Sequence, residues 1–335
     1  MRWSPPAQIE EYRVLRPLGR GATGSVYLAH DLLLDREVAI KFVDVEGDPA
    51  WQHQLLLEAR AVAKLQHRNV VTAYRVGQLL GRTYLVTELV RGQSLDQLPR
   101  PLPWRRVLEL AIGLARGLGA AHRHGLLHRD VKPANAMLSE DGEVKLLDFG
   151  LATEMGSKSR AHGVTATIPE QGFRNSADTT ETLSWAEAAH SNANTATLGR
   201  RDTEEPVGSP LYMAPELWRG EHATSRSDIY SLGIILYELC SGDAPHRGVP
   251  VAELPHRVQK GAIVPLHRAV PSIGSHFALI VDRCLSLRPR MRFTSGDALL
   301  AALETCASAS ASPTSIIDQV ERVLPLRMSR AAKRP

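Results

Sequence analysis

The N-terminal third of the chain alternates short apolar runs with polar turns, a pattern typical of β-strands. Residues 25–29 and 37–43 are two such runs with a charged turn between them, and residues 83–92 predict a last strand that leaves into a connector. Residues 51–66 instead carry leucine, valine and alanine at spacings of three and four, which predicts a helix. We therefore expect a small, strand-rich unit that contains a helix.

The remainder of the chain is dominated by helical patterns. Residues 104–124 are rich in leucine, alanine and isoleucine and are followed by Gly125, a residue that commonly ends a helix. Residues 143–147 predict a strand, and a further apolar helix is expected to begin at Asp228.

Two stretches depart from this organisation. Residues 155–206 contain thirteen serines and threonines and few large apolar side chains, so they cannot bury much surface and are expected to be disordered or loosely helical. Residues 306–335 begin in an alanine- and serine-rich segment and end in basic residues, which predicts a solvated, flexible tail. The alternative for this tail is a short helix that binds a membrane surface or a partner.

Composition places the protein among soluble globular chains. Apolar residues make up 43% and charged residues 23% of the 335 positions, and no stretch approaches the length of a membrane span. The N-terminus lacks the apolar core of a signal peptide, and three scattered cysteines provide neither a disulfide framework nor metal-ligand spacing. A net charge of +4 without a basic run argues against nucleic-acid binding. These features predict a cytoplasmic protein without a transmembrane segment.

The most distinctive chemistry lies in residues 128–135, His-Arg-Asp-Val-Lys-Pro-Ala-Asn, which are followed by Asp148 in an Asp-Phe-Gly triplet. Asn135 and Asp148 supply the hard oxygen ligands that Mg²⁺ prefers. Asp130 can orient a hydroxyl group and accept its proton, and Lys132 can offset the charge of a phosphoryl group in transfer. This set predicts phosphoryl transfer from a magnesium nucleotide, and a polar turn without chemistry is the structural alternative.

A glycine-rich stretch precedes the strand of residues 37–43 and allows the backbone to approach phosphates. The same G-x-G-x-x-G spacing opens dinucleotide-binding folds, but there a helix must follow it, whereas a strand is predicted here. A glycine loop between strands predicts a hairpin that covers a nucleotide. Its residues are Leu18, Gly19, Arg20, Gly21, Ala22, Thr23, Gly24, Ser25 and Val26.

Together these motifs resemble the eukaryotic-like (Hanks-type) serine/threonine protein kinases, and in particular those of bacteria. The resemblance extends over about residues 10–305. It implies a bilobal α+β fold with an N-terminal extension at 1–9, a small β-rich N-lobe at 10–90 and a larger, mainly helical C-lobe at 91–305. It also implies ATP as the nucleotide and Mg²⁺ as the metal, with Mn²⁺ as a substitute.

The resemblance implies specific pairs of charged residues and an adenine pocket. Lys41 is expected to contact the α- and β-phosphates and to pair with Glu58, because an unpaired ammonium group on an apolar strand is costly. Asp228 is expected to brace the catalytic loop, and Arg292 is expected to pair with Glu216. Without the resemblance, Glu58 would be interpreted as a solvated helix position. The adenine pocket is expected to include Ala39, Thr87, Glu88 and Val90.

Residues 208–216 resemble the substrate-docking segment of protein kinases, which small-molecule phosphotransferases usually lack. Lys132, two residues after Asp130, implies serine and threonine rather than tyrosine as the acceptors. Ser209 stands where threonine is commoner in the family, although its hydroxyl group can still bond Asp130 and Lys132. The expected partners are therefore proteins with serine and threonine acceptors.

The resemblance also suggests how the enzyme is regulated. Arg129 often binds an activation-loop phosphate in related kinases, and a phosphate on a residue such as Thr203 would order residues 155–206 against it. The alternative is a tolerated polar surface insertion. Family members also activate by transient self-association and phosphorylation in trans, although no residue of this sequence marks such an interface.

The sequence thus predicts an ATP-dependent serine/threonine protein kinase that phosphorylates proteins, itself included. The rival is a pseudokinase, a binding or scaffold module with the same fold and no turnover. Such proteins usually lose the lysine, the catalytic aspartate or the metal-binding aspartate, whereas Lys41, Asp130 and Asp148 are all present.

Overall fold

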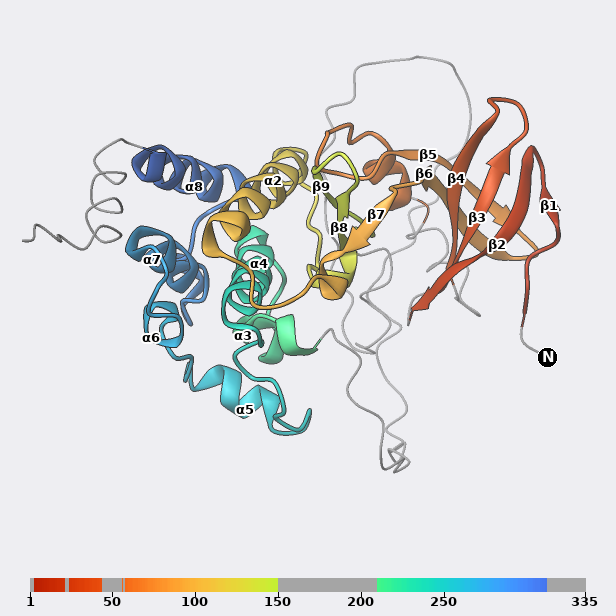
Figure 1. The fold of residues 1–335 in the computed structure, drawn as a ribbon. Helices are drawn as coiled ribbons and strands as arrows, with labels where there is room; N and C mark the ends of the chain where they lie inside the picture. Colours follow the sequence, from red (N-terminus) through yellow and green to blue (C-terminus); the bar gives the residue numbers. More distant parts are fainter. Residues whose placement is uncertain (1–2, 22–23, 44–55, 57, 150–209, 312–335) are drawn as a thin grey trace, which may run out of the picture. The chain divides into compact units, whose positions relative to one another are not determined.

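The computed structural model describes residues 3–21, 24–43, 56, 58–149 and 210–311. Six antiparallel strands in the order β1-β2-β3-β4-β6-β5 form the main sheet (Figure 1). They are β1 (Gln8–Ile9), β2 (Tyr12–Gly21), β3 (Gly24–Asp31), β4 (Arg36–Val43), β5 (Ala73–Leu79) and β6 (Arg82–Glu88). A second, three-stranded sheet consists of β7 (Gly92–Ser94), β8 (Ala136–Ser139) and β9 (Val144–Leu146).

Outside these two sheets, the regular elements of the described residues are helices. The α-helices are α2 (Trp104–Arg123), α3 (Pro215–Trp218), α4 (Ser225–Ser241), α5 (Leu254–Gln259), α6 (Leu266–Ala269), α7 (Ser275–Cys284) and α8 (Gly296–Ala311). Short 3-10 turns lie at Leu95–Gln97, Pro133–Asn135, Pro210–Tyr212 and Pro289–Met291. A β-rich part followed by a mainly helical part confirms the predicted α+β class.

The glycine-rich stretch forms the predicted hairpin between β2 and β3. Gly21 pairs with Gly24 at its end, and the chain continues as a strand, which excludes the strand-to-helix turn of a dinucleotide-binding fold. Gly24 has φ of +149°, and a Cβ atom there would lie 1.9 Å from the carbonyl oxygen of Phe42. Glycine is therefore required where β3 meets β4. Ala22 and Thr23 lie outside the described residues.

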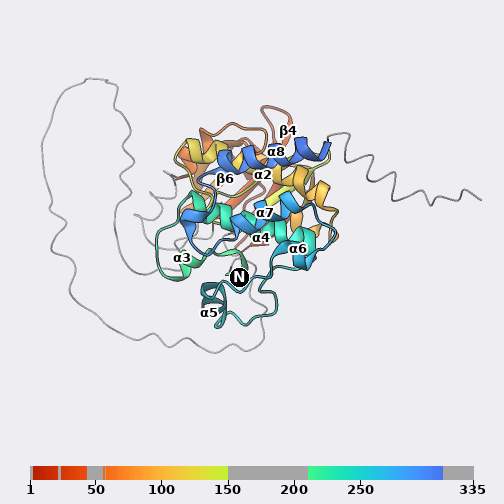
Figure 2. The same cartoon turned by 90° about the vertical axis from the view of Figure 1, so that its left-hand side faces the viewer.

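The C-lobe core is built around α4, whose residues from Ser227 to Cys240 are all buried. A capping box between Thr224 and Ser227 begins this helix, and Gly242, with φ of +99°, follows its last turn. Helices α2, α7 and α8 pack against it with leucine, isoleucine and phenylalanine side chains. Figures 1 and 2 both show α8 lying along α2.

Two glycines of α2 bring β9 close to this helix. A Cβ atom on Gly113 would lie 2.4 Å from Cγ1 of Val144, and one on Gly117 would lie 2.6 Å from the carbonyl oxygen of Asn69. Larger residues would therefore push away β9 or the segment beside it. Since β8 and β9 connect the loop at residues 128–135 to Asp148, this close packing helps to position both motifs.

The predicted elements agree with the structure at most places and differ at their ends. The strand predicted at residues 83–92 is two strands, because β6 ends at Glu88 and β7 begins at Gly92. Within the helix predicted at 51–66, the described residues 56 and 58–63 are helical. The last helix continues to Ala311, beyond the expected start of the tail, because Cys306 is buried in the core. Within the described ranges, no helix combines the length and apolarity that a membrane crossing needs.

Candidate active site

The charged side chains of the loop between α2 and β8 contact one another. Lys132 Nζ lies 2.7 Å from Oδ2 of Asp130. The side-chain amide of Asn135 donates to the same Oδ2 atom and to the backbone carbonyl of Asp130, both at 2.9 Å. Asp130 is therefore held in one orientation by two neighbours, while 17% of its side chain stays exposed. An oriented, accessible carboxylate is suited to binding a hydroxyl group.

Asp228 braces this loop through its backbone, as expected. Its two carboxylate oxygens accept hydrogen bonds from the backbone N–H groups of His128 at 2.8 Å and of Arg129 at 2.9 Å. Arg129 has φ of +63°, a conformation that needs such external support. His122 adds a contact that the sequence did not reveal: its Nδ1 accepts from the N–H of Gly296 at 3.1 Å, so its Nε2 donates to Asp228 at 3.0 Å.

His128 packs between this loop and the residues around Asp148. Its Nε2 donates to the carbonyl of Leu147 at 2.8 Å, and its ring lies 4.7 Å from that of Phe149. Burial lowers the pKa of His128 below its usual value, although the negative charges of Asp228 and Asp130 oppose this effect. The imidazole is therefore neutral near pH 7 and links the catalytic loop to the residues before Asp148.

Asn135 and Asp148 are brought together by the backbone. The N–H of Leu147 donates to the carbonyl of Asn135 at 2.8 Å, which places Asp148 next to the loop. Because the side-chain nitrogen of Asn135 is committed to Asp130, its side-chain oxygen is the atom that remains for a metal ion. Within the described residues no three His, Cys, Asp or Glu side chains form a metal cluster. This donor set fits Mg²⁺, which usually binds one or two protein oxygens together with water and phosphate.

The structure pairs Lys41 and Glu58 differently from the expectation. Lys41 Nζ lies 3.0 Å from Oδ2 of Asp148, and Oε1 of Glu58 lies 3.1 Å from Nη1 of Arg129. Asp148 thus neutralises the lysine, and Arg129 neutralises the glutamate, so neither needs the other as its counter-charge. In place of the expected Lys41–Glu58 pair, this conformation pairs Lys41 with Asp148 and Glu58 with Arg129.

A cavity of about 670 Å³ lies beside Lys41 and Asp148. Several of the predicted nucleotide-binding residues line it, namely Leu18, Gly19, Val26, Ala39, Lys41, Thr87, Glu88 and Val90. Arg20, Gly21, Gly24 and Ser25 belong to the hairpin but are not among the lining residues. The sequence did not single out several apolar lining residues, which are Leu28, Val71, Ala73, Leu85, Met137, Leu147 and Phe149. They come from β3, β5, β6, β8 and the segments beside them, so the fold is needed to show that they face one cavity.

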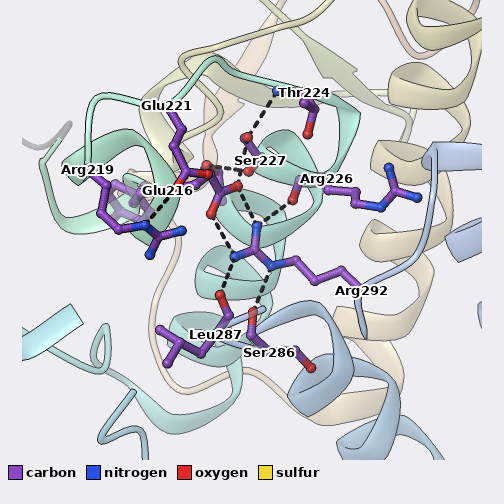
Figure 3. A network of polar contacts seen from close by, with 11 residues as sticks. Glu216, Arg219, Glu221, Thr224, Arg226, Ser227, Ser286, Leu287 and Arg292 are labelled. Carbon is purple, nitrogen blue, oxygen red and sulfur yellow. Dashed lines mark hydrogen bonds and ion pairs between the residues drawn. The ribbon is translucent and has the colours of Figure 1, made fainter. Parts of the chain in front are cut away.

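The described part of the docking segment begins at Pro210 and is anchored by Glu216 (Figure 3). Arg292 donates to both carboxylate oxygens of Glu216, at 2.7 and 2.9 Å, and Ser227 donates to one of them at 2.8 Å. Burial works against the charged carboxylate, but the bonds and charge of Arg292 outweigh it and hold the pKa of Glu216 below its ordinary value. The expected Glu216–Arg292 pair is confirmed.

Both the side chain and the backbone of Tyr212 form hydrogen bonds to α4. Its hydroxyl group donates to Oε2 of Glu238 at 2.7 Å, and its carbonyl accepts from the hydroxyl group of Ser231 at 2.8 Å. Arg100 and Arg247 neutralise the fully buried Glu238. Burial and the adjacent carboxylate raise the pKa of Tyr212, which therefore stays protonated. The docking segment is thus attached to the most buried helix of the C-lobe.

The predicted regulatory and docking positions are Arg129, Thr203 and Ser209. Thr203 and Ser209, together with the insert at 155–206, lie outside the described residues. Arg129 is described, and its guanidinium group contacts Glu58.

The arrangement of sheet, catalytic loop and docking segment defines a protein kinase fold, and a solved structure supports this. The kinase domain of PknI from Mycobacterium tuberculosis has a TM-score of 0.62 and 23% identity, over 91% of this chain and 99% of that one. A family model described as the protein kinase domain matches residues 12–170 and 187–303. The chain belongs to the protein kinase domain family.

Curated relatives confirm the predicted likeness to bacterial Hanks-type kinases. PknL of Mycobacterium tuberculosis, a serine/threonine-protein kinase, is 32% identical over 307 residues, which cover 90% of this chain and 67% of PknL. A probable serine/threonine-protein kinase of Streptomyces coelicolor is 33% identical over 299 residues, 86% of this chain and 39% of its own length. PrkC of Bacillus subtilis is 28% identical over 303 residues, 89% of this chain and 41% of its own. The chain thus spans less than half of two of these relatives.

Proposed function

We propose that the chain transfers the γ-phosphoryl group of ATP to serine and threonine hydroxyl groups of proteins, itself included. The observation that carries this proposal is the ordered trio of Asp130, Lys132 and Asn135, which lies beside Asp148 and the cavity. Each of these residues is held by a described contact, so the loop is preorganised for charge stabilisation.

The nucleotide would bind in this cavity and contact residues from several of the elements that line it. Glu88, Leu89 and Val90 line it, and their backbone would pair with adenine. Lys41 lines it as well and would contact the α- and β-phosphates. Asn135 and Asp148 would hold Mg²⁺, or Mn²⁺ in its place, which supplies positive charge to the β- and γ-phosphates.

In the transfer step Asp130 orients the acceptor. The substrate hydroxyl group donates a hydrogen bond to the Asp130 carboxylate, its oxygen attacks the γ-phosphorus, and its proton passes to Asp130. The bond from the γ-phosphorus to the bridging oxygen breaks, and ADP leaves with the electron pair. Lys132, at 2.7 Å from Asp130, stabilises the negative charge of the phosphoryl group in transfer.

We also propose a cellular setting for this activity. The three cysteines are free and buried, which suits a reducing compartment, and we place the kinase in the cytoplasm with access to ATP. Protein substrates with serine or threonine acceptors are its proposed partners. Transient self-association would allow one copy to phosphorylate another.

The test is transfer of label from γ-radiolabelled ATP to a generic protein substrate. We expect Asp130→Asn to reduce the rate by about a thousandfold, because it removes the proton acceptor. Lys41→Ala should also abolish most of the transfer, since it removes the contact to the phosphates. Both proteins should unfold at nearly the wild-type temperature, which excludes misfolding as the cause.

Three outcomes would contradict the proposal in different ways. Label transfer that survives both substitutions would show that these residues are not the catalytic ones. Label found only in a small molecule would indicate a small-molecule phosphotransferase. Absence of any transfer by a folded wild-type protein with Mg²⁺ and Mn²⁺ would indicate a pseudokinase.

A further inference from the structure

The carboxylate of Glu88, at the end of β6, is held by two separate segments. Its Oε1 atom accepts a hydrogen bond from the N–H of Thr72 at 2.8 Å, and the N–H of Glu88 donates in return to the carbonyl of Thr72 at 2.9 Å. Lys145 Nζ lies 2.7 Å from Oε1 and 3.0 Å from Oε2. Both carboxylate oxygens are therefore engaged by Lys145, and one is shared with Thr72.

Lys145 comes from β9, the strand that leads to Asp148. This strand is firmly attached to its neighbour: the N–H of Leu146 donates to the carbonyl of Asn69 at 2.9 Å, and the Asn69 side chain donates to the carbonyl of Val144 at 2.8 Å. The ammonium group of Lys145 therefore extends from a fixed backbone. A fixed donor can hold a flexible acceptor in place.

The contact between Lys145 and Glu88 is shielded well enough to have a measurable effect. Their side chains are only 19% and 22% exposed, so water and salt compete with the pair less than on an open surface. Without the ammonium group of Lys145, the partly buried carboxylate of Glu88 would keep the hydrogen bond from the N–H of Thr72. The carboxylate would then gain by turning toward water, and it would move the Glu88 backbone with it.

That backbone belongs to the nucleotide cavity. Glu88, Leu89 and Val90 are consecutive lining residues, and under the proposed function they pair with the adenine edge. We propose that Lys145 is a positioning residue for the nucleotide base: it holds the Glu88 carboxylate and thereby fixes the hinge backbone in the conformation that adenine requires. This inference rests on the proposed use of ATP.

A substitution of Lys145 could also act at the other end of the nucleotide. Lys145 precedes Asp148 by three residues, so a disturbed β9 would shift the metal-binding carboxylate instead. Adenosine separates the two routes, because it carries the base and ribose but no phosphates. A hinge effect weakens adenosine and ATP alike, whereas a metal-site effect weakens ATP alone.

The experiment compares Lys145→Met with the wild-type protein. Methionine keeps much of the side-chain length and removes the charge. We expect the KM for ATP to rise about tenfold, as loss of a charge-assisted contact implies, with kcat within about twofold and the KM for the protein substrate unchanged. The calorimetric Kd for adenosine should rise by the same factor. Lys64→Met, at an exposed lysine outside the site, is the matched control and should change none of these values.

A second substitution tests whether Lys145 acts through Glu88. Glu88→Gln keeps an oxygen acceptor for the N–H of Thr72 and removes the charge that Lys145 binds. It should raise the KM for ATP about as much as Lys145→Met, and the double substitution should raise it no further. Lys145→Arg, which keeps a positive charge at this place, should restore most of the affinity for adenosine.

Each remaining outcome decides against the inference or against the proposed activity. An unchanged adenosine Kd in Lys145→Met, or fully additive effects with Glu88→Gln, would overturn the role of Lys145. Wild-type protein that transfers no label but binds adenosine in a Lys145-dependent way would contradict the activity and support the hinge contact. Wild-type protein that neither transfers label nor binds adenosine would overturn both.

Discussion

The buried charges of the C-lobe and the charges beside the nucleotide cavity are arranged in contrasting ways. Arg292, which is 0% exposed, donates to Glu216 and also to backbone carbonyls, among them those of Arg226 at 2.9 Å and Ser286 at 2.8 Å. Lys41, Asp148, Glu58 and Arg129 are between 11% and 34% exposed and meet in two ion pairs.

We call the buried Arg292–Glu216 network of the C-lobe the frame. The partly exposed pairs beside the cavity, Lys41–Asp148 and Glu58–Arg129, form an adjustable site. A buried guanidinium group with several acceptors has one favourable arrangement, because any other leaves polar atoms unsatisfied. Partly exposed pairs lose less when they separate, because water replaces the lost partner. The frame therefore holds the segment that begins at Pro210, and the charges beside the cavity can exchange partners at a lower cost.

Breaking the frame should have the largest effect on stability. We expect Arg292→Met to lower the free energy of unfolding by about 3–5 kcal/mol, because the carboxylate of Glu216 would be left buried without its counter-charge. Urea denaturation measures this change. Arg219→Met is the matched control: its partner Glu221 is 55% exposed, and the loss should be under about 1 kcal/mol (Figure 3). Equal losses of unfolding free energy in Arg292→Met and Arg219→Met would show that the buried pair is no more stabilising than the exposed one.

The packing of α2 on β9 should show the next largest effect. In Gly117→Ala the new Cβ atom would meet the carbonyl oxygen of Asn69 at 2.6 Å, and backbone must move, at a cost of about 1–3 kcal/mol. In Gly113→Ala the close atom is Cγ1 of Val144, at the end of a side chain, so the cost should be smaller. Thermal unfolding of both variants tests this order. The reverse order would show that the segment at Asn69 yields more readily than β9.

The motifs that are contiguous in sequence were the ones that sequence reasoning could place. The loop from His128 to Asn135 carries its chemistry within eight residues, so its acids and bases are close whatever the rest of the chain does. The glycine hairpin was predictable for the same reason, since a strand was expected on the far side of the turn.

Pairs between distant residues could not be predicted from pattern alone. Lys145 looks like a stray lysine in an arginine-biased chain, and its partner Glu88 lies 57 positions away. His122 joins Asp228 and Gly296 only because α2, α4 and the start of α8 pack together. The choice of partner for such groups depends on which strands and helices become neighbours, and periodicity in one segment carries no information about that.

The pair of Glu58 and Arg129 should contribute little to stability. We expect Glu58→Gln to lower the free energy of unfolding by roughly 0.2–1 kcal/mol, as for other partly exposed pairs. Phosphoryl transfer should fall far more, because the same carboxylate is expected to pair with Lys41 once Asp148 binds metal. Denaturation and label transfer on the same preparation measure both. A stability loss as large as that of Arg292→Met would place Glu58 in the frame instead.

The smallest expected effect is a pH dependence that arises from two buried histidines. Burial, together with the charge of Arg257, lowers the pKa of His246, and burial also lowers that of His128. The unfolded chain then binds protons more readily, so stability is full above the ordinary histidine pKa of 6.5 and declines as the pH falls below it. We expect Tm to drop between about pH 7.5 and about pH 5.5, and His246→Leu to show a smaller drop. An equal drop in both proteins would show that His246 does not carry this dependence and that the titrating groups lie elsewhere in the protein.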